Sequence, residues 1–221
     1  MLDCVLFDMD GLLVDSEPLQ YRAYQYAFEQ FGISLSMDDW IRWHSVEAST
    51  ARWIEREQLD LDVPLLREVK KQRYEQLIAA ELTLKPGVRE LVEDCSTEMK
   101  LAVVSASRRE SIVACLAKFD LIEHFSVLVS ADQVARSKPF ADPYLAAIRA
   151  LETSPERAIA VEDSVTGFRA ASAAQLACVV CPDHFIPKAE GAFDSAALVT
   201  ESLKELSARR LLSLHSAFHN Q

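Results

Sequence analysis

Short apolar runs rich in β-branched residues alternate along most of this chain with longer amphipathic segments, and this alternation restricts the folds available to it. The runs lack polar residues at alternate positions, as is typical of strands buried on both faces of a parallel sheet. Between the runs, apolar residues recur at helical spacing. The order of strands and helices predicts a three-layer α/β core. The predicted strands are Cys4–Phe7, Leu101–Val104, Val127–Val129, Ala158–Val161 and Ala177–Cys181.

Residues 17–81 depart from this alternation. They contain no strand-like run, and their apolar residues recur only at helical spacing. We therefore predict a core domain formed by residues 1–16 and 82–221, and a smaller all-helical domain inserted at residues 17–81. The tryptophans of the chain all fall in this insertion, where they either pack its helices together or help to exclude water from a closed site. They are Trp40, Trp43 and Trp53.

The composition argues against several classes of protein. Half of the residues are apolar and the formal net charge is −11, so the chain lacks the basic surface that nucleic acids require. Charged residues interrupt every apolar run before it could cross a membrane, and the first residues do not resemble a signal peptide. The five cysteines are scattered, and the lone C-x-x-C of Cys178 and Cys181 is interpreted as part of a buried strand, since no second pair completes a zinc site. We expect a cytoplasmic monomer that binds neither nucleic acid nor membrane.

Three of the predicted strands end in polar residues. Ligands of open parallel sheets bind at the carboxyl ends of the strands, so these residues are expected to gather at one edge. Several carboxylates cannot share a site without a counter-charge, because their mutual repulsion raises their pKa values. Mg²⁺, a hard cation that prefers oxygen ligands, meets this need, and Lys138 can add a fixed positive charge. The three segments are Asp8-Met9-Asp10-Gly11, Ser105-Ala106-Ser107-Arg108 and Glu162-Asp163-Ser164.

This combination of groups predicts phosphoryl transfer. A carboxylate can attack phosphorus to form an acyl phosphate, which divides one difficult displacement into two. The metal ion and the lysine would then neutralise the phosphoryl oxygens. Asp10, two residues after Asp8, could protonate the leaving oxygen and then deprotonate the next nucleophile. Gly11 permits a tight turn beside the phosphate.

Each element taken alone also has a simpler structural interpretation. The D-x-D-G segment that starts at Asp8 can be an acidic turn after an edge strand. Ser105 and Ser107 can cap the helix that follows them. Lys138 can be a solvated loop residue, and the acidic pair before Ser164 can be a helix N-terminus. Their joint occurrence in this order, three of them at strand ends, favours the functional interpretation.

At these positions the chain resembles the haloacid dehalogenase superfamily of phosphotransferases. The stretch from Asp8 to Glu17, Asp-Met-Asp-Gly-Leu-Leu-Val-Asp-Ser-Glu, is similar to the first motif of that family. Three later segments are similar to its second, third and fourth motifs, and the resemblance covers nearly the whole chain. It implies a Rossmann-like core with a parallel sheet and an inserted α-helical cap. The matching residues are Ser105, Lys138 in Ser-Lys-Pro, and Glu162-Asp163-Ser164 with Gly167 and Ala170-Ala171.

The resemblance also implies a role for each of these residues. Asp8 would be the nucleophile that carries an aspartyl phosphate, and Asp10 would be the acid and base. Mg²⁺ would be held by Asp8, the backbone carbonyl of Asp10, and Asp163, with Glu162 as a direct or water-mediated ligand. The phosphate would be held by Ser105, Lys138 and the backbone amides of Met9, Asp10 and Ala106.

Within the family the chain is most similar to the β-phosphoglucomutase-like branch, but its cap departs from that pattern. The mutase grips the distal group of its substrate with a Lys-Gly pair and a nearby arginine, which residues 43–49 of this chain lack. A mutase must hold a bisphosphate intermediate, whereas a phosphatase needs only to admit water. We therefore predict a phosphatase acting on a sugar phosphate or a similar small phosphorylated metabolite, with Arg52 or His44 replacing the missing cation, although His44 can instead pack against a helix. The alternatives are a phosphomutase of the β-phosphoglucomutase type and a catalytically weak protein that binds a metabolite.

Overall fold

The structure of the chain, a computed structural model, describes residues 2–42, 50–185 and 191–219. It divides into two compact units, each of which is built from more than one segment of the chain. The second unit includes a short segment from late in the sequence, whose described residues are Asp183, His184 and Phe185. No sequence pattern indicated that this segment would leave the core. The first unit comprises Met1–Val14, Leu84–Pro182 and Gly191–Gln221, and the second comprises Asp15–Thr83 and Asp183–Glu190.

The first unit is built around a six-stranded sheet with the order β3-β2-β1-β4-β5-β6, in which every neighbouring pair is parallel. In the centre of the sheet, Phe7 at the end of β1 lies opposite Val103 of β2 and Val161 of β4. All five predicted strands are present. β6 was not predicted, because a strand of two residues leaves no pattern in the sequence. The strands are β1 (Cys4–Phe7), β2 (Lys100–Val104), β3 (Val127–Val129), β4 (Ala158–Glu162), β5 (Ala177–Val180) and β6 (Leu198–Val199).

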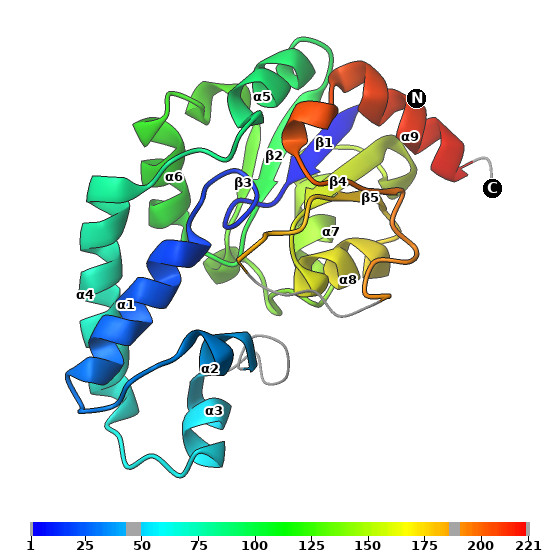
Figure 1. Cartoon of the computed structure of the whole chain (residues 1–221). Helices are drawn as coiled ribbons and strands as arrows, with labels where there is room; N and C mark the ends of the chain where they lie inside the picture. Colours follow the sequence, from blue (N-terminus) through cyan, green and yellow to red (C-terminus); the bar gives the residue numbers. More distant parts are fainter. Residues whose placement is uncertain (1, 43–49, 186–190, 220–221) are drawn as a thin grey trace. The chain divides into compact units, whose positions relative to one another are not determined.

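Helices cover both faces of this sheet (Figure 1). On one face, α7 (Asp142–Ala150) and α8 (Val165–Ala173) pack Tyr144, Ile148 and Phe168 against strand residues such as Leu6 and Val104. On the other face, α5 (Val88–Ser96) and α9 (Ala208–His219) lie against the strands, and α6 (Arg109–Lys118) packs beside β3. Short 3-10 segments lie at Ile122–His124, Ala131–Gln133, Pro155–Arg157 and Leu203–Glu205.

The regular elements described in the second unit are all helices, and α1 and α4 pack against each other. Trp40 and Trp53 are 1% and 3% exposed in its core beside Phe28, so these two tryptophans pack the helices together. Trp43 lies outside the described residues. From the late segment, Phe185 places its ring centroid 5.7 Å from that of Tyr21. The helices are α1 (Glu17–Glu29), α2 (Met37–Arg42), α3 (Thr50–Arg56) and α4 (Val63–Glu81). The predicted fold class, a Rossmann-like α/β core with an inserted helical cap, is confirmed.

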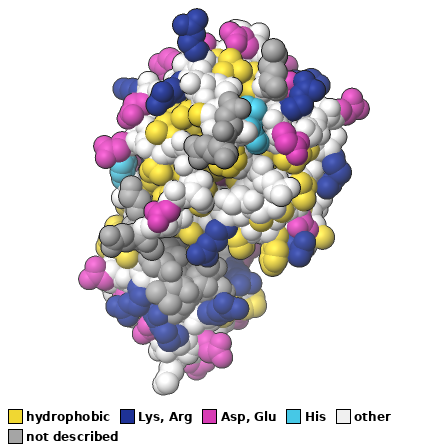
Figure 2. Space-filling model, turned by 90° about the vertical axis from the view of Figure 1, so that its right-hand side faces the viewer, with side chains coloured by type: hydrophobic (Ala, Val, Ile, Leu, Met, Phe, Trp, Pro, Cys, Tyr) yellow, Lys and Arg dark blue, Asp and Glu magenta, His cyan; other side chains and the backbone are white. Residues whose placement is uncertain are grey.

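The surface carries charges of both signs. On the face in Figure 2, Lys and Arg side chains are interspersed with Asp and Glu side chains. Over the whole chain 34 acidic residues outnumber 23 basic ones, so an anionic ligand has to be attracted by local cations rather than by the overall field. In the described part of the chain, no helix combines the length and apolar character needed to cross a membrane.

Four of the five cysteines are buried in packed elements. Cys178 lies on the buried strand β5 as predicted and is 1% exposed, whereas β5 ends at Val180, so the partly exposed Cys181 lies just beyond the strand that was predicted to include it. Burial raises the pKa of Cys4, Cys95 and Cys115 to about 12. Burial, and secondarily the charge of Glu162, also raises the pKa of Cys178 well above its ordinary value.

We expect the folded protein to react rapidly with iodoacetamide at one thiol, that of the partly exposed Cys181. At pH 8, a thiol whose pKa is about 12 is a thiolate in only ~0.01% of molecules, so the buried cysteines should react only on unfolding. Mass spectrometry of native and urea-unfolded protein measures this directly. Cys181→Ser should lose the rapid phase and Cys115→Ser should keep it, whereas fast labelling of several thiols in the native state would contradict the packing described above.

Candidate active site

β1 carries Asp8 and Asp10 to the middle of the carboxyl edge of the sheet. β1 lies between β2 and β4, and the Asp8 amide continues the strand pairing by donating to the Val161 carbonyl at 3.0 Å. The chain then turns back, with the Met9 carbonyl accepting three successive amides and Gly11 adopting a φ of 85°. The backbone therefore fixes this loop, and it leaves the Asp8 side chain almost fully buried.

Two serines from the loop after β2 hold the side chain of Asp10. The Ser105 and Ser107 hydroxyls donate to Asp10 Oδ2 at 3.2 and 2.8 Å. The Ser107 amide donates to Ser105 Oγ at 3.0 Å, which orients that hydroxyl. No hydrogen bond between described residues uses Asp10 Oδ1. One oxygen of Asp10 is thus anchored, and the other remains available for proton transfer.

A buried lysine connects the loop after β1 with the end of β4. Lys138 Nζ donates to Asp8 Oδ1 at 2.5 Å and to Glu162 Oε1 at 2.6 Å. The exposed fractions of the Lys138, Asp8 and Glu162 side chains are 6%, 10% and 0%. Charges buried to this extent lose their hydration, so each must keep close polar partners. Lys138 is therefore a fixed part of the site and not a solvated loop residue.

Asp8, Glu162 and Asp163 form a buried cluster of carboxylates. Each offers one oxygen, and these oxygens lie within 4.8 Å of one another; no other such cluster occurs among the described residues. An all-oxygen donor set suits a hard cation such as Mg²⁺ better than a softer transition metal. Three carboxylates around one lysine also leave a net negative charge. The residues present therefore fit the predicted divalent cation.

Burial and the neighbouring charges shift the pKa values of this cluster. Burial raises the pKa of Asp8 well above its ordinary value, Glu162 and Asp10 raise it further, and Lys138 offsets only part of the effect. Burial lowers the pKa of Lys138, but Asp8 and Glu162 outweigh it and bring that pKa above its ordinary value. Lys138 is therefore an ammonium ion at neutral pH, and further positive charge would favour ionised Asp8.

The structure rejects most of the simpler interpretations of the single elements. β1 is a central strand, so the turn at Asp8 does not follow a sheet edge. The two serine hydroxyls do not cap α6, whose N-cap residue is Arg108, because they bond to Asp10 instead. Ser164 does cap α8, since its Oγ accepts the Gly167 amide at 3.1 Å, but the Glu162 carboxylate points into the site toward Lys138.

The structure adds two side chains to the site that were not among the predicted site residues. Ser107 shares its strand end with Ser105, and that position was the only signal for it in the sequence. Tyr144 donates its hydroxyl to Glu162 Oε1 at 2.5 Å. In the sequence, Tyr144 is one apolar position of an amphipathic helix, so only the packing of α7 reveals its polar contact.

The remaining predicted site residues fall into three groups. Met9 and Ala106 lie in the loops after β1 and β2, where their backbone amides accompany Asp10 and Ser105. Arg52 is an exposed residue of α3 in the second unit. His44 lies outside the described residues. For all four, contact with a substrate or a phosphate stays a prediction.

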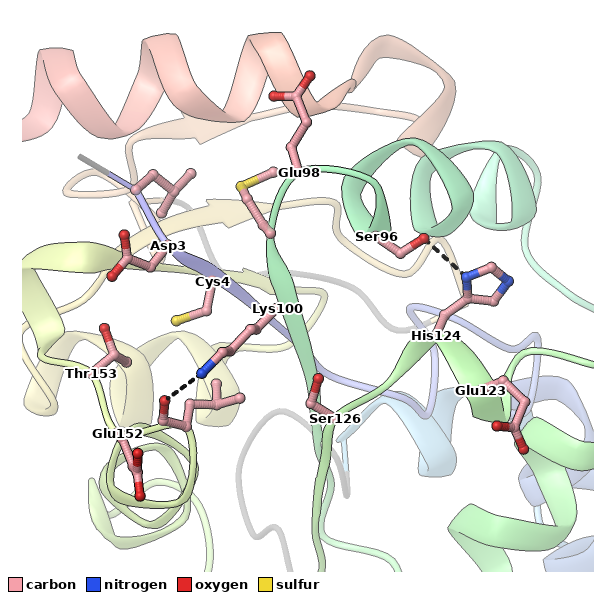
Figure 3. A pocket seen from close by; sticks show the side chains of 13 residues that line it. Asp3, Cys4, Ser96, Glu98, Lys100, Glu123, His124, Ser126, Glu152 and Thr153 are labelled. Carbon is pink, nitrogen blue, oxygen red and sulfur yellow. Dashed lines mark hydrogen bonds between the residues drawn. The ribbon is translucent and has the colours of Figure 1, made fainter.

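A separate hollow of about 790 Å³ lies at the opposite edge of the sheet, around the amino ends of β1 and β2 (Figure 3). Lys100 reaches across it and donates to the Leu151 carbonyl at 3.4 Å. His124 Nδ1 lies 2.9 Å from Ser96 Oγ. The lining includes none of the site carboxylates, so this hollow is distinct from the site that the strand ends create.

Comparison with known proteins identifies the family of this chain. A family model described as haloacid dehalogenase-like hydrolase matches residues 5–181. The chain belongs to this family. Among its haloacid dehalogenase-like relatives, protein CbbY of Cereibacter sphaeroides is 32% identical over 97% of this chain and 98% of that protein. Hexitol phosphatase B of Escherichia coli strain K12 is 33% identical over 94% of this chain and 95% of that protein.

The solved structure of one relative has a similar fold. The crystal structure of a variant of CbbY from Rhodobacter sphaeroides in complex with xylulose-(1,5)bisphosphate has a TM-score of 0.79 and 30% identity, covering 93% of this chain and 96% of that one. The predicted family, and the predicted enzyme class of a haloacid dehalogenase-type phosphoric monoester hydrolase, are confirmed by these relatives.

We expect Lys138→Met to destabilise the folded protein by about 3–5 kcal/mol, because it leaves Asp8 and Glu162 buried without their cation. Urea unfolding in the presence of a chelator measures the change. The matched control is Lys71→Met, which breaks only an exposed pair with Glu75 at 3.9 Å and should unfold like the parent. Equal unfolding midpoints for the two variants would contradict the role of Lys138 in holding the site together.

Proposed function

We propose that this protein is a Mg²⁺-dependent phosphatase that hydrolyses a phosphorylated carbohydrate through an aspartyl phosphate on Asp8. The observation that carries the proposal is the buried contact of Asp8 with Lys138 in a cluster that includes Asp163, with Asp10 anchored by two hydroxyls on the neighbouring loop. The relatives support the substrate class, since one is named a hexitol phosphatase and another was crystallised with a sugar bisphosphate.

In the first step, an oxygen of Asp8 attacks phosphorus and the bond between phosphorus and the ester oxygen breaks. Asp10 gives its proton to the leaving oxygen, so the carbohydrate departs as a neutral alcohol. Because Ser105 and Ser107 both bond to Oδ2 of Asp10, Oδ1 is the oxygen left to carry that proton. Lys138, in contact with Asp8, stabilises negative charge on the transferring group.

In the second step, water attacks the phosphorus of the aspartyl phosphate, and Asp10 takes a proton from that water. The bond from phosphorus to Asp8 breaks, which regenerates the carboxylate and releases inorganic phosphate. Each cycle consumes one water and returns Asp8 and Asp10 to their starting states. Asp10 thus serves as acid and base in turn, as one group can when its position is fixed.

Asp8, Asp163 and the backbone carbonyl of Asp10 would hold Mg²⁺, with Glu162 as a direct or water-mediated ligand. When bound, Mg²⁺ would neutralise phosphoryl oxygens and favour the ionised form of Asp8. In the second unit, Arg52 or His44 would contact the distal part of the substrate. The phosphate would be held by Ser105, Lys138 and the amides of Met9, Asp10 and Ala106.

We expect Mg²⁺-dependent phosphate release from at least one member of a panel containing hexitol phosphates, sugar monophosphates, xylulose 1,5-bisphosphate and p-nitrophenyl phosphate. Asp8→Asn should lower the rate by at least ~10³-fold, since it removes the nucleophile. A matched control is Asp3→Asn, because Asp3 lies next to the other end of β1 and pairs with Arg157. Acid-quenched parent enzyme should also contain a hydroxylamine-sensitive acyl phosphate that is missing from Asp8→Asn.

Phosphate release that survives Asp8→Asn would rule out this mechanism. Binding of Mg²⁺ without turnover of any ester would instead favour the catalytically weak metabolite-binding protein. Asp3→Asn should remain within about two-fold of the parent, because Asp3 touches none of the reacting groups. A parallel loss in Asp3→Asn would attribute the effect to folding rather than to chemistry.

The second candidate is a phosphomutase, which is favoured by the likeness of Ser105–Arg108 and Ser137–Pro139 to the mutase branch. A phosphatase should convert β-glucose 1-phosphate or another ester into equal amounts of alcohol and inorganic phosphate, with no isomerised ester. Adding a catalytic amount of sugar bisphosphate should leave that rate unchanged. Phosphorus NMR distinguishes the products, and a bisphosphate-dependent appearance of the isomer would establish the mutase instead.

A further inference from the structure

The Glu162 carboxylate is the most completely enclosed charge in the site, at 0% exposed. Its Oε1 accepts the Tyr144 hydroxyl at 2.5 Å and the Lys138 ammonium at 2.6 Å. Its Oε2 accepts the Asp163 amide at 3.2 Å and the Ser164 hydroxyl at 3.4 Å. A carboxylate offers about four lone-pair positions, so protein donors already use the full set.

Gly167 confines the same carboxylate from the side of α8. A Cβ atom at this position would overlap the whole carboxyl group of Glu162. The backbone of Gly167 is helical, so the shortage of space, and not an unusual backbone angle, requires glycine here. Glu162 therefore lies between the first turn of α8 and the side chain of Tyr144 on α7.

The Tyr144 side chain contacts both members of the Glu162–Lys138 ion pair. It is 0% exposed, and Glu162 is the partner of its hydroxyl. Lys138 Nζ also lies over the face of its ring, 5.2 Å from the centroid, within the range of a cation–π contact. Tyr144 of α7 thus orients the Glu162 carboxylate and also contacts the Lys138 ammonium that this carboxylate binds.

We propose that Tyr144 is a positioning residue for phosphoryl transfer, which fixes Glu162 so that Glu162 directs the Lys138 ammonium at Asp8. This proposal rests on the proposed function of the site. It also restricts the role of Glu162. This carboxylate positions Lys138 and contacts the metal ion at most through a bridging water. Without the hydroxyl, Oε1 would keep one donor only, and both Glu162 and Lys138 would be free to move away from Asp8.

The test is Tyr144→Phe, which removes one hydroxyl and keeps the ring. We expect kcat for the best ester to fall about 10-fold, with KM within about two-fold of the parent, because poor placement of Lys138 affects the transition state more than substrate binding. Tyr21→Phe is the matched control, since it removes a hydroxyl that bonds to the Leu35 carbonyl in the second unit. Gly167→Ala perturbs the same carboxylate independently and should lower kcat at least as much.

Mn²⁺ binding, followed by electron paramagnetic resonance without substrate, separates positioning of Lys138 from metal binding. Tyr144→Phe and Glu162→Gln should bind Mn²⁺ within about three-fold of the parent, whereas Asp163→Asn should bind at least ~10-fold more weakly. A parental kcat in Tyr144→Phe would overturn the proposal. So would a loss of Mn²⁺ affinity in Glu162→Gln as large as that in Asp163→Asn.

The two measurements also separate this proposal from the proposed function. If the parent releases no phosphate from any ester, the proposed function fails. The Mn²⁺ comparison then decides by itself whether Glu162 is held for Lys138 or for the metal ion, because it needs no turnover. A uniform loss of Mn²⁺ binding and of thermal stability in Tyr144→Phe would show a general packing role, and would overturn the positioning role.

Discussion

The buried contact of Lys138 with Asp8 and Glu162 is the interaction on which the rest of the site depends. It joins the ends of two central strands to the loop that precedes α7. Without it, both carboxylates would be buried with no counter-charge, which costs several kcal/mol. In the proposed mechanism, the cation that neutralises the cluster also stabilises the negative charge that develops on the phosphoryl group, because Lys138 contacts Asp8. A positive charge at this position therefore stabilises the cluster and also serves the proposed chemistry.

The order of the strands explains why so many polar groups meet there. With β1 between β2 and β4, three strand ends lie side by side, and each is followed by residues that carry carboxylates or hydroxyls. Short backbone hydrogen bonds fix the loop after β1, and Ser105 and Ser107 hold Asp10 from the loop after β2. Beneath them, buried residues of the strands and helices pack into one hydrophobic core, which supports the site.

Much of this arrangement could be predicted from the sequence. Uninterrupted apolar runs identified five of the six strands, because a strand buried on both faces has to be apolar at every position. The residues Asp8, Asp10, Ser105, Lys138, Glu162 and Asp163 could be singled out because each follows a predicted strand or stands in a family motif. Local patterns fail where contacts are formed across long distances in sequence. β6 is too short to leave a pattern, and the late segment that begins at Asp183 joins the second unit through contacts such as Phe185 with Tyr21.

The sequence by itself determined the α/β fold class and which side chains stand at the strand ends, since both follow from periodicity and motif order. Only the tertiary structure decided which of these side chains hold one another. Ser107 bonds to Asp10 across 97 residues of sequence, and Tyr144 bonds to a carboxylate that is buried on all sides. In the sequence a buried tyrosine is one more apolar position of a helix. Its hydroxyl acquires a role only when packing places it against Glu162, because a buried polar group must find a partner and packing determines which one is available.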